Sequence, residues 1–290
     1  MKRTRIKGCC ISSIAEAELA VADGVDALGL LGDMPSSPRA IDMDVASEIA
    51  QSVPPAVESF FLSASLSGND IVDQVEYCGT TAVQIVQYAE ANQYERIIEQ
   101  IPSVRRVQVI HVENRAALDL MELFEPYVHT FILDGGRAGS AIADLGGKGR
   151  VHDWQISSEF VQRSSKPVFL ASGLNTQNAR ETIATVAPFG LDVCSGVRRA
   201  NRLDAQLLDV FTENVWRIQD LVAATSVHTA TTTHNGSRQL YRGAEGRLRR
   251  VGQNSARDRL AWGLHDGCSD DSATGASLKE MALWEWICVE

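Results

Sequence analysis

Short apolar runs alternate with longer amphipathic stretches along residues 5–222. The runs are nearly continuous in apolar side chains, which is typical of strands buried on both faces, and the stretches between them repeat their apolar residues with the period of a helix. The predicted strands are 5–10, 27–31, 56–64, 82–86, 106–112, 130–134, 167–172 and 191–195, and the helices that follow them are 14–22, 44–52, 70–77, 93–101, 114–127, 153–163, 176–186 and 204–222. Ser12 or Ser13, Asn69 and Asn175 are predicted to cap the first, third and seventh helices.

Eight strand–helix units in one chain predict an α/β fold, with a parallel sheet covered by helices. Their number and length favour a closed (β/α)8 barrel, or TIM barrel, whose typical size is ~250 residues. An open doubly wound sheet is the alternative. In such a barrel the active site is built from the C-terminal ends of the strands and the loops that follow them. We therefore predict one catalytic barrel domain over residues 1–222, with its chemistry at these strand ends.

The composition of the chain changes at residue 223. Residues 223–275 are rich in Thr, Ser, Gly and Arg without apolar periodicity, and a short helix is predicted at 278–289. We interpret residues 223–290 as a low-complexity C-terminal extension that is largely disordered and ends in this helix. A translation artefact such as a shifted reading frame is the other interpretation. The extension holds eight basic and eight acidic residues, so the net charge of the chain belongs to the barrel.

Composition and charge narrow the class of ligand. The 290 residues are 44% hydrophobic and 22% charged, as in ordinary globular proteins, and the formal net charge is −10. This sign disfavours binding to nucleic acid or to an anionic membrane, so we expect a small-molecule ligand. The cysteines include no CxxC pair and the histidines show no metal-site spacing, so we expect no metal. Because the sequence shows no apolar signal core and no long apolar run, the predicted location is the cytoplasm.

Two reactive side chains end predicted strands. Cys9 and Cys10 end the first strand, where alternation would place Cys9 with Lys7 on one face and Cys10 on the other. Cys9 is a candidate thiolate base or, alternatively, a small buried apolar residue. Asp134 ends the sixth strand, where partial burial would raise its pKa enough for a general acid, and a helix cap or loop anchor is the alternative role.

Glycine-bearing loops follow the later strands, at 146–149, 171–175 and 194–197. Two of these loops come after the seventh and eighth strands, where this fold binds phosphate through backbone N–H groups. Turn formation alone is the alternative role for these glycines. After the second strand, Pro38 stiffens a loop that presents Arg39, which is either a bidentate ligand for a carboxylate or a surface arginine.

Taken together, these strand ends resemble phosphoribosylanthranilate isomerase, a (βα)8-barrel family of tryptophan biosynthesis. The matching segments occur in the family's order and are 7–12, 37–39, 83–84, Asp134, 146–149, 153–154, 170–175, Asn178 and 192–197. The resemblance spans residues 5–216 and leaves the extension uncovered.

The resemblance implies an Amadori rearrangement, an intramolecular aldose–ketose oxidoreduction that converts N-(5-phosphoribosyl)anthranilate into 1-(2-carboxyphenylamino)-1-deoxyribulose 5-phosphate. It implies that Asp134 is the general acid and Cys9 the general base, with no cofactor and no metal. Arg39 would bind the anthranilate carboxylate. Substrate contacts are expected from Arg39, Gln84, Gly147, Gly173, Ser195 and Gly196, the last four around the phosphate. The family contains monomers and homodimers, and we expect one of these states here.

Several positions depart from the family pattern. Val86 stands where the family has a histidine, Cys10 and Ser172 replace glycines, and Lys148 and Arg198 add positive charge near the phosphate end. These changes leave the acid and the base in place but alter the rim of the site, so two other functions stay open. One is another cofactor-free phosphosugar isomerase or lyase, and the other is a non-catalytic barrel that binds an anionic metabolite.

Overall fold

The computed structural model describes residues 3–32, 34, 37, 39–135 and 153–216, all within one compact unit, Met1–Ser237. In it, eight parallel strands follow one another around a closed barrel in chain order, and β8 pairs with β1 to complete it. The predicted α/β barrel is therefore confirmed, and the alternative of an open sheet is wrong. The predicted extension, 223–290, lies outside the described residues.

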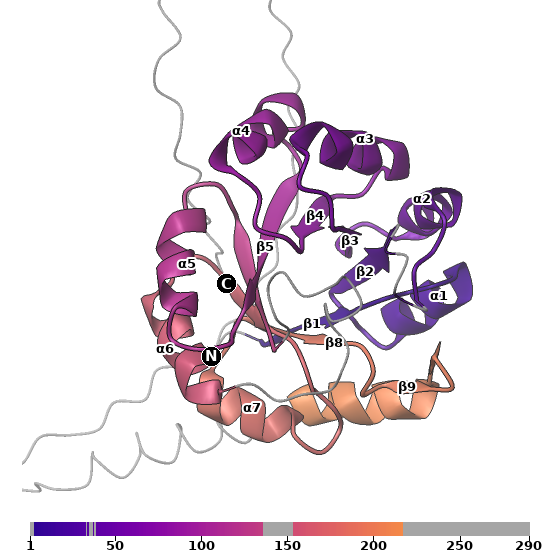
Figure 1. Cartoon of the computed structure of the whole chain (residues 1–290). Coiled ribbons are helices and arrows are strands. Elements are labelled where there is room, and N and C mark those ends of the chain that lie inside the picture. Colours follow the sequence, from indigo (N-terminus) through magenta and orange to yellow (C-terminus); the bar gives the residue numbers. More distant parts are fainter. Residues whose placement is uncertain (1–2, 33, 35–36, 38, 136–152, 217–290) are drawn as a thin grey trace, which may run out of the picture. The chain divides into compact units, whose positions relative to one another are not determined.

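Strands and helices alternate along the chain, and Figure 1 shows the helices surrounding the strands. The strands are β1 (Arg5–Gly8), β2 (Ala27–Leu31), β3 (Glu58–Ser63), β4 (Ala82–Ile85), β5 (Arg105–His111), β6 (Thr130–Asp134), β7 (Val168–Leu170) and β8 (Gly190–Val193). The helices are α1 (Ile14–Ala22), α2 (Met43–Ser52), α3 (Gly68–Cys78), α4 (Ala91–Gln100), α5 (Ala117–Phe124), α6 (Trp154–Arg163) and α7 (Ala179–Val186), and residues 205–216 are helical as well.

The strands from β2 to β7 divide their apolar side chains between two cores. In β3, Phe60 and Leu62 belong to the core inside the barrel, whereas Phe61 between them packs in the outer core against the helices. Every strand and every helix from α1 to α7 contributes to the outer core. Buried polar groups such as Gln84 and Asp134 interrupt the inner core. Because the strands are buried on both faces, they appear in the sequence as nearly continuous apolar runs.

The predicted first strand is too long. β1 ends at Gly8, and beyond it Cys10 has a positive φ of 59°, where a strand residue would be extended. Because the strand alternation stops there, Cys9 and Cys10 both line the mouth of the barrel. The prediction that they lie on opposite faces is therefore wrong. β8 likewise ends at Val193, before the predicted end of that strand.

Two of the predicted helix caps are also wrong. The hydroxyl of Ser67, not the side chain of Asn69, caps α3, which begins at Gly68. Asn175 precedes α7 by a full turn, because its side-chain oxygen accepts two N–H groups of the loop and the helix begins only at Ala179. Both helices still lie where the apolar periodicity placed them.

A short antiparallel hairpin that the sequence pattern did not predict follows β8. Its strands are β9 (Arg198–Arg199) and β10 (Arg202–Leu203). The central residues, Ala200 and Asn201, have positive φ angles of 48° and 64°, as the type I′ turn of a two-residue hairpin requires. The hairpin holds Arg198 beside the start of α1.

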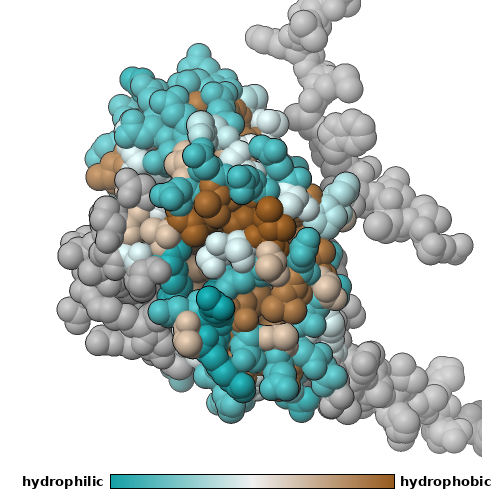
Figure 2. Space-filling model, turned by 90° about the vertical axis from the view of Figure 1, so that its right-hand side faces the viewer, coloured by the Kyte–Doolittle hydropathy of each residue, from teal (hydrophilic) through white to brown (hydrophobic). Residues whose placement is uncertain are grey.

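One face of the molecule shows an apolar region on its surface. Figure 2 views the molecule from the right-hand side of Figure 1 and shows apolar residues in the middle of this face, with hydrophilic residues around them. The other exposed large apolar side chains are scattered over different elements, at Ile14, Leu66, Tyr77, Leu123, Phe189 and Val210. Within the described ranges, no helix combines the length and the apolar composition that a membrane-spanning helix needs.

Candidate active site

A pocket with about 790 Å³ of empty space opens where the barrel strands end. Every strand, or the loop after it, contributes at least one residue to the lining. The apolar part comes from inner-core side chains such as Leu31, Leu62, Val109 and Ile132. A largely apolar pocket with a few convergent polar groups at this end of a barrel is the usual form of a small-molecule site.

Most of the residues predicted for the site line this pocket. They are Cys9, Arg39, Gln84, Asp134, Gly173 and Ser195. Gly196 is the next residue after Ser195 and pairs with Asn175 in an isolated β-bridge. Gly147 lies outside the described residues. The fold therefore brings together side chains and loops that follow six different strands.

Asp134 ends β6, and its carboxyl group is buried at the pocket. Burial raises the pKa of this group to about 6, the negative charge of Asp192 adds to the rise, and His111 opposes it. One carboxyl oxygen accepts a hydrogen bond from the hydroxyl of Ser172, which itself accepts the N–H of Gly135 at 2.9 Å. In the described part of the chain the group caps no helix. A carboxyl with this pKa keeps a usable protonated fraction near neutral pH, as a general acid needs.

Two residues beside Asp134 were not expected in the site. His111 is its register partner on β5, with Nδ1 4.0 Å from the carboxylate and Nε2 3.2 Å from the carbonyl oxygen of Val86. This Nδ1 is buried and has no hydrogen-bond partner among the described residues. Ser172 has a φ of 68°, a conformation that costs about 1–3 kcal/mol outside glycine. The sequence signal for His111 was a polar residue that ends an apolar strand.

A buried ion pair lies beneath Cys9. Lys7 Nζ lies 3.0 Å from both carboxylate oxygens of Asp192, across the β1–β8 pairing that closes the barrel. Burial alone would lower the pKa of Lys7, but Asp192 outweighs it and raises that pKa above its usual range. Lys7 and Cys9 share a face, as predicted. Both side chains lie over Gly29 of β2, where an added Cβ would lie 2.8 Å from Lys7 Nζ and 3.2 Å from Cys9 Sγ. Gly29 therefore leaves the space in which the ammonium and the thiol lie together.

Three thiols meet at the mouth of the barrel. Cys9 Sγ lies 3.8 Å from Cys10 Sγ, and the thiol of Cys194 lies close enough to both to shift their pKa values. The hydrogen bond from Cys10 lowers the pKa of Cys9, but contact with Cys194 and burial outweigh it, so the pKa is raised overall. The pKa of Cys194 lies well below its usual range, because both other thiols donate to it and Arg39 is near. Among the described residues, no group of three or more Cys, His, Asp or Glu side chains is arranged to hold a metal ion.

Two buried polar atoms of the pocket residues have no hydrogen-bond partner among the described residues. Arg39 Nε and Gln84 Oε1 are buried and form no hydrogen bond with the described residues. Leaving such an atom unpaired costs about 1–3 kcal/mol, which a ligand that pairs with it offsets. Arg39 is only partly exposed and lines the pocket, so its alternative role as a plain surface arginine does not fit its position.

The loops after β7 and β8 are bound to each other. The side-chain amides of Asn178 and Asn175 donate to the carbonyl oxygen of Gly173 at 2.8 and 3.2 Å. Asn175 also pairs with Gly196. A Cβ at Gly196 would lie 1.9 Å from the carbonyl oxygen of Leu174, so only glycine allows this approach. The two loops thus form one rigid rim of the pocket.

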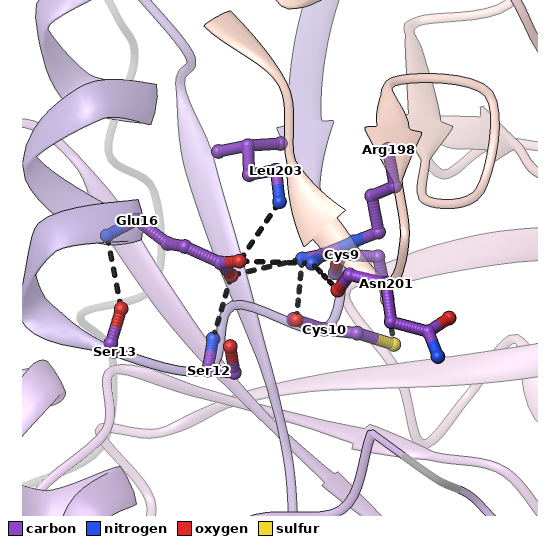
Figure 3. Close-up of polar contacts among 8 residues, drawn as sticks. All are labelled: Cys9, Cys10, Ser12, Ser13, Glu16, Arg198, Asn201 and Leu203. Carbon is purple, nitrogen blue, oxygen red and sulfur yellow. Dashed lines mark hydrogen bonds and ion pairs between the residues drawn. The ribbon is translucent and has the colours of Figure 1, made fainter.

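The sequence suggested that Arg198 extends toward the phosphate end of the site, but in the structure it does not. Its guanidinium is buried and bonds both carboxylate oxygens of Glu16, at 3.1 and 3.2 Å (Figure 3). It also donates to the carbonyl oxygens of Cys10 and Cys9, at 2.6 and 3.3 Å. The positive charge is therefore used inside the protein, where it fixes the backbone that carries both cysteines.

Glu16 connects this pair to two further segments. Its carboxylate accepts the N–H groups of Ser12 and of Leu203 in β10, at 3.0 and 2.9 Å (Figure 3). Ser13 caps α1, as predicted, by accepting the N–H of Glu16 at 3.2 Å. The Arg198–Glu16 pair thus joins the β9–β10 hairpin, the start of α1 and the loop after β1.

Comparison with known proteins identifies the family. The sequence model of N-(5'phosphoribosyl)anthranilate (PRA) isomerase matches residues 6–214. The N-(5'-phosphoribosyl)anthranilate isomerase of Methanocella arvoryzae is 34% identical over 213 residues, which make up 73% of this chain and 98% of that protein. N-(5'-phosphoribosyl)anthranilate isomerase 2 of Methanosarcina mazei is 32% identical over 198 residues, 68% of this chain and 87% of that protein. The crystal structure of phosphoribosyl anthranilate isomerase from Thermotoga maritima matches with a TM-score of 0.64 at 25% identity and covers 73% of this chain and 98% of that one. This chain belongs to the phosphoribosylanthranilate isomerase family.

Proposed function

We propose that this chain converts N-(5′-phosphoribosyl)anthranilate into 1-(2-carboxyphenylamino)-1-deoxyribulose 5-phosphate, with Asp134 as general acid and Cys9 as general base. The observation that carries this assignment is that both groups line one pocket at the mouth of the barrel. Membership of the family supplies the reaction. Because the rearrangement moves hydrogen within one molecule, it consumes no oxidant, reductant or cofactor.

The first step opens the ribose ring. The Asp134 carboxyl donates its proton to the ring oxygen while the bond between that oxygen and C1 breaks, and the anthranilate nitrogen supplies the electron pair that forms a C1=N Schiff base. Burial supports this role, because a pKa of about 6 keeps part of the Asp134 population protonated near neutral pH. Ser172 holds the carboxyl through its hydroxyl, so the acid is oriented before the substrate arrives.

The second step removes the proton from C2. The Cys9 thiolate takes this proton, the electrons of the C2–H bond form an enolamine with C1, and the enolamine becomes the ketone when C1 gains a proton and the hydroxyl at C2 loses one. A raised pKa makes Cys9 a stronger base but lowers its thiolate fraction. The ammonium of Lys7 opposes that loss, because it favours the negative charge on the sulfur.

The remaining site residues bind the two ends of the substrate. Arg39 Nε and Gln84 Oε1 have no hydrogen-bond partner among the described residues, which supports a bond from Arg39 to the anthranilate carboxylate and acceptance of a substrate N–H or O–H by Gln84. The rigid rim formed by Gly173, Ser195 and Gly196 supports phosphate binding, and Gly147 belongs to the same proposal.

The proposal is tested by following the loss of anthranilate-type fluorescence after the substrate has been generated in situ. We expect the wild-type chain to accelerate the conversion, and Asp134→Asn to lower kcat about 10²–10⁴-fold, because the amide has no acidic proton to donate. Cys9→Ser is expected to lower kcat on a similar scale with little change in affinity for a product analogue, since the thiolate acts in the transition state.

Arg115→Ala serves as a matched control, because Arg115 is exposed and its ion pair with Glu159 lies at the surface. This variant should keep wild-type turnover. A folded wild-type chain without any acceleration contradicts the proposal and favours another phosphosugar isomerase or lyase. Near-normal turnover in Cys9→Ser or Asp134→Asn removes the corresponding role.

The same proposal places the enzyme in the cytoplasm, as a monomer or a homodimer that works on a phosphorylated small molecule without nucleic acid or membrane. Sedimentation equilibrium of the purified full chain distinguishes the two states, and any larger assembly contradicts both. Fractionation of cells that express the natural gene tests the location, which a membrane or secreted fraction would contradict.

A further inference from the structure

Three of the cysteines gather where the proposed base lies. Cys9, Cys10 and Cys194 all line the pocket, with 3.8 Å between the sulfurs of Cys9 and Cys10, and Cys194 directly follows β8, the neighbour of β1. The proposed reaction uses only Cys9. We propose that the mouth of this barrel is an oxidation site, at which hydrogen peroxide converts Cys9 and Cys194 into a reversible disulfide.

The strand pairing places Cys9 and Cys194 next to each other at the ends of β1 and β8. β1 and β8 are adjacent and parallel, Gly8 is paired with Val193, and the N–H of Cys9 donates to the carbonyl oxygen of Val193 at 2.8 Å. The residue that directly follows each of these strands is a cysteine, Cys9 after β1 and Cys194 after β8. Neighbouring strands lie ~4.8 Å apart, which is inside the Cα–Cα range of ~4.4–6.8 Å that a disulfide spans. Both side chains face the pocket, so a disulfide between them requires no rotation of β1 or β8.

The pairing of Cys9 with Cys10 is geometrically poor by comparison. Consecutive Cα atoms are only ~3.8 Å apart across a trans peptide, below the disulfide range, so their bond needs a change of backbone. That backbone is fixed, because Arg198 donates to both carbonyl oxygens and is itself held by Glu16 (Figure 3). The Arg198–Glu16 pair therefore directs oxidation across the strands.

Charge and exposure single out Cys194 as the thiol that reacts first. It is partly exposed, whereas Cys9 and Cys10 are buried. The neighbouring thiols of Cys10 and Cys9 lower its pKa most, and the guanidinium groups of Arg39 and Arg198 add to this effect, so its thiolate, the form that attacks peroxides, is favoured. Peroxide reaching the open pocket thus meets Cys194 before it meets the other two sulfurs.

The chemistry consumes one peroxide for two thiols. The Cys194 thiolate attacks one oxygen of hydrogen peroxide, the O–O bond breaks, and the departing hydroxide takes a proton and becomes water, which leaves a sulfenic acid on Cys194. The Cys9 sulfur then attacks the sulfenic sulfur, the S–S bond forms, and the hydroxyl group leaves with the Cys9 proton as a second water. Two thiols are oxidised and one peroxide is reduced. A dithiol reductant reverses the change by thiol–disulfide exchange.

The disulfide removes the proposed base, so oxidised protein should be inactive. This consequence rests on the proposed function of Cys9, whereas formation of the disulfide does not. Mass spectrometry of the bond and assay of the enzyme therefore answer separate questions.

The test uses the full chain with Cys268→Ser and Cys288→Ser, which removes the two cysteines outside the described residues. The folded protein is treated with one equivalent of hydrogen peroxide, its free thiols are alkylated, and it is digested with trypsin. Cleavage after Lys7, Arg39, Arg180 and Arg198 places Cys9 and Cys10 in peptide 8–39 and Cys194 in peptide 181–198. We expect these two peptides to be linked, and a Cys10→Ser variant to keep the link.

Cys194→Ser should abolish the link. After peroxide treatment, this variant should show no loss of activity, relative to its own untreated value, that dithiothreitol can restore. The parent protein should lose activity more than about tenfold and recover it on reduction. Cys78→Ser is the matched control, because Cys78 is buried in α3 and lies outside the pocket, so the link should form as before. Peptides that stay unlinked, or a bond confined to peptide 8–39, would overturn the proposal. A link without loss of activity would leave the oxidation site in place and overturn the role of Cys9.

Discussion

Asp134 owes its raised pKa to burial, and His111 opposes that rise. The Cys9 thiol has a pKa above its usual range, so Asp134 ionises first as the pH increases. At a pH between the two pKa values, Asp134 and Cys9 together hold one proton. The fraction of enzyme molecules with this proton on Asp134 and the negative charge on Cys9 is constant over that pH range. We therefore expect kcat/KM to rise with pH up to about 6, level off, and fall only when the thiol ionises. A pH–rate profile of kcat/KM, recorded in a buffer that holds each pH constant, measures this dependence.

His111→Gln should move the lower limb of that profile to higher pH. The imidazole lowers the pKa of Asp134, so its removal should raise that pKa. His129→Gln is the control, because the ring of His129 accepts the N–H of Arg106 at the other end of β5 and should not affect the limb. An unchanged limb in His111→Gln would show that the histidine does not influence the acid.

Arg39→Ala should raise KM and leave kcat nearly unchanged. The guanidinium is proposed to bind the substrate carboxylate equally in the ground state and the transition state, and a charged hydrogen bond of this kind contributes about 1.5–3 kcal/mol. This corresponds to an increase in KM of roughly ten- to a hundredfold. Steady-state kinetics on Arg39→Ala and Arg39→Lys measure it. If the KM of Arg39→Ala stays at the wild-type value, Arg39 does not bind the substrate.

At the scale of elements, the Arg198–Glu16 pair is the connection between the β9–β10 hairpin and α1. Arg198→Ala should destabilise the fold by about 3–5 kcal/mol, because it leaves a partly buried carboxylate and two carbonyl oxygens without their donor. Urea unfolding measures this loss. Arg163→Ala is the surface control, since its pairs with Glu122 and Glu159 are exposed and contribute about 0–1 kcal/mol.

The contribution of this pair also depends on pH. The N–H of Leu203 and the charge of Arg198 outweigh burial and lower the pKa of Glu16. A carboxyl with a lowered pKa in the folded state adds stability above its unfolded pKa, and that stability is lost as the pH falls through the folded value. The difference between wild type and Arg198→Ala should therefore be full at neutral pH and shrink below about 4.5. A difference that persists undiminished at pH 3 would contradict this linkage.

The elements themselves could be predicted because each strand is buried on both faces, so that apolar runs and helical periodicity mark them directly. The left-handed conformations of Cys10 and Ser172 could not, because hydropathy carries no information about φ at a residue that is not glycine. Contacts between strands were equally hidden. The approach of His111 to Asp134 and of Cys194 to Cys9 follows from the register of neighbouring strands, which closure of the whole barrel determines.

Most of the candidate site was predicted for the same reason as the fold. In a parallel barrel, every strand end lies at one face, so polar residues at strand ends converge without any knowledge of their distances. This rule does not predict in which direction the side chain of a residue at a strand end points. Arg198 follows β8 like Ser195, but the hairpin turns it away from the pocket and toward Glu16.

At the scale of the whole molecule, the barrel closes within residues 5–193, through the pairing of β1 with β8 and the buried bond between Lys7 and Asp192. The final helical segment, 205–216, completes the outer core, because Leu208, Phe211 and Val215 are fully buried in it. The relative from Methanocella arvoryzae is matched over 98% of its length by only 73% of this chain. A complete family barrel is thus contained in the matched part.

A chain that ends at residue 222 should therefore fold and keep isomerase activity within a few-fold of the full chain. It retains the closing strand pair and the helix that carries Phe211, whereas a chain that ends at residue 203 loses that helix and exposes the outer core. Burial of three large apolar side chains contributes about 2 kcal/mol each, so this shorter chain should not fold. Circular dichroism, thermal unfolding and the fluorescence assay on the three chains measure the difference. Loss of folding in the chain of 222 residues would show instead that the barrel depends on residues 223–290.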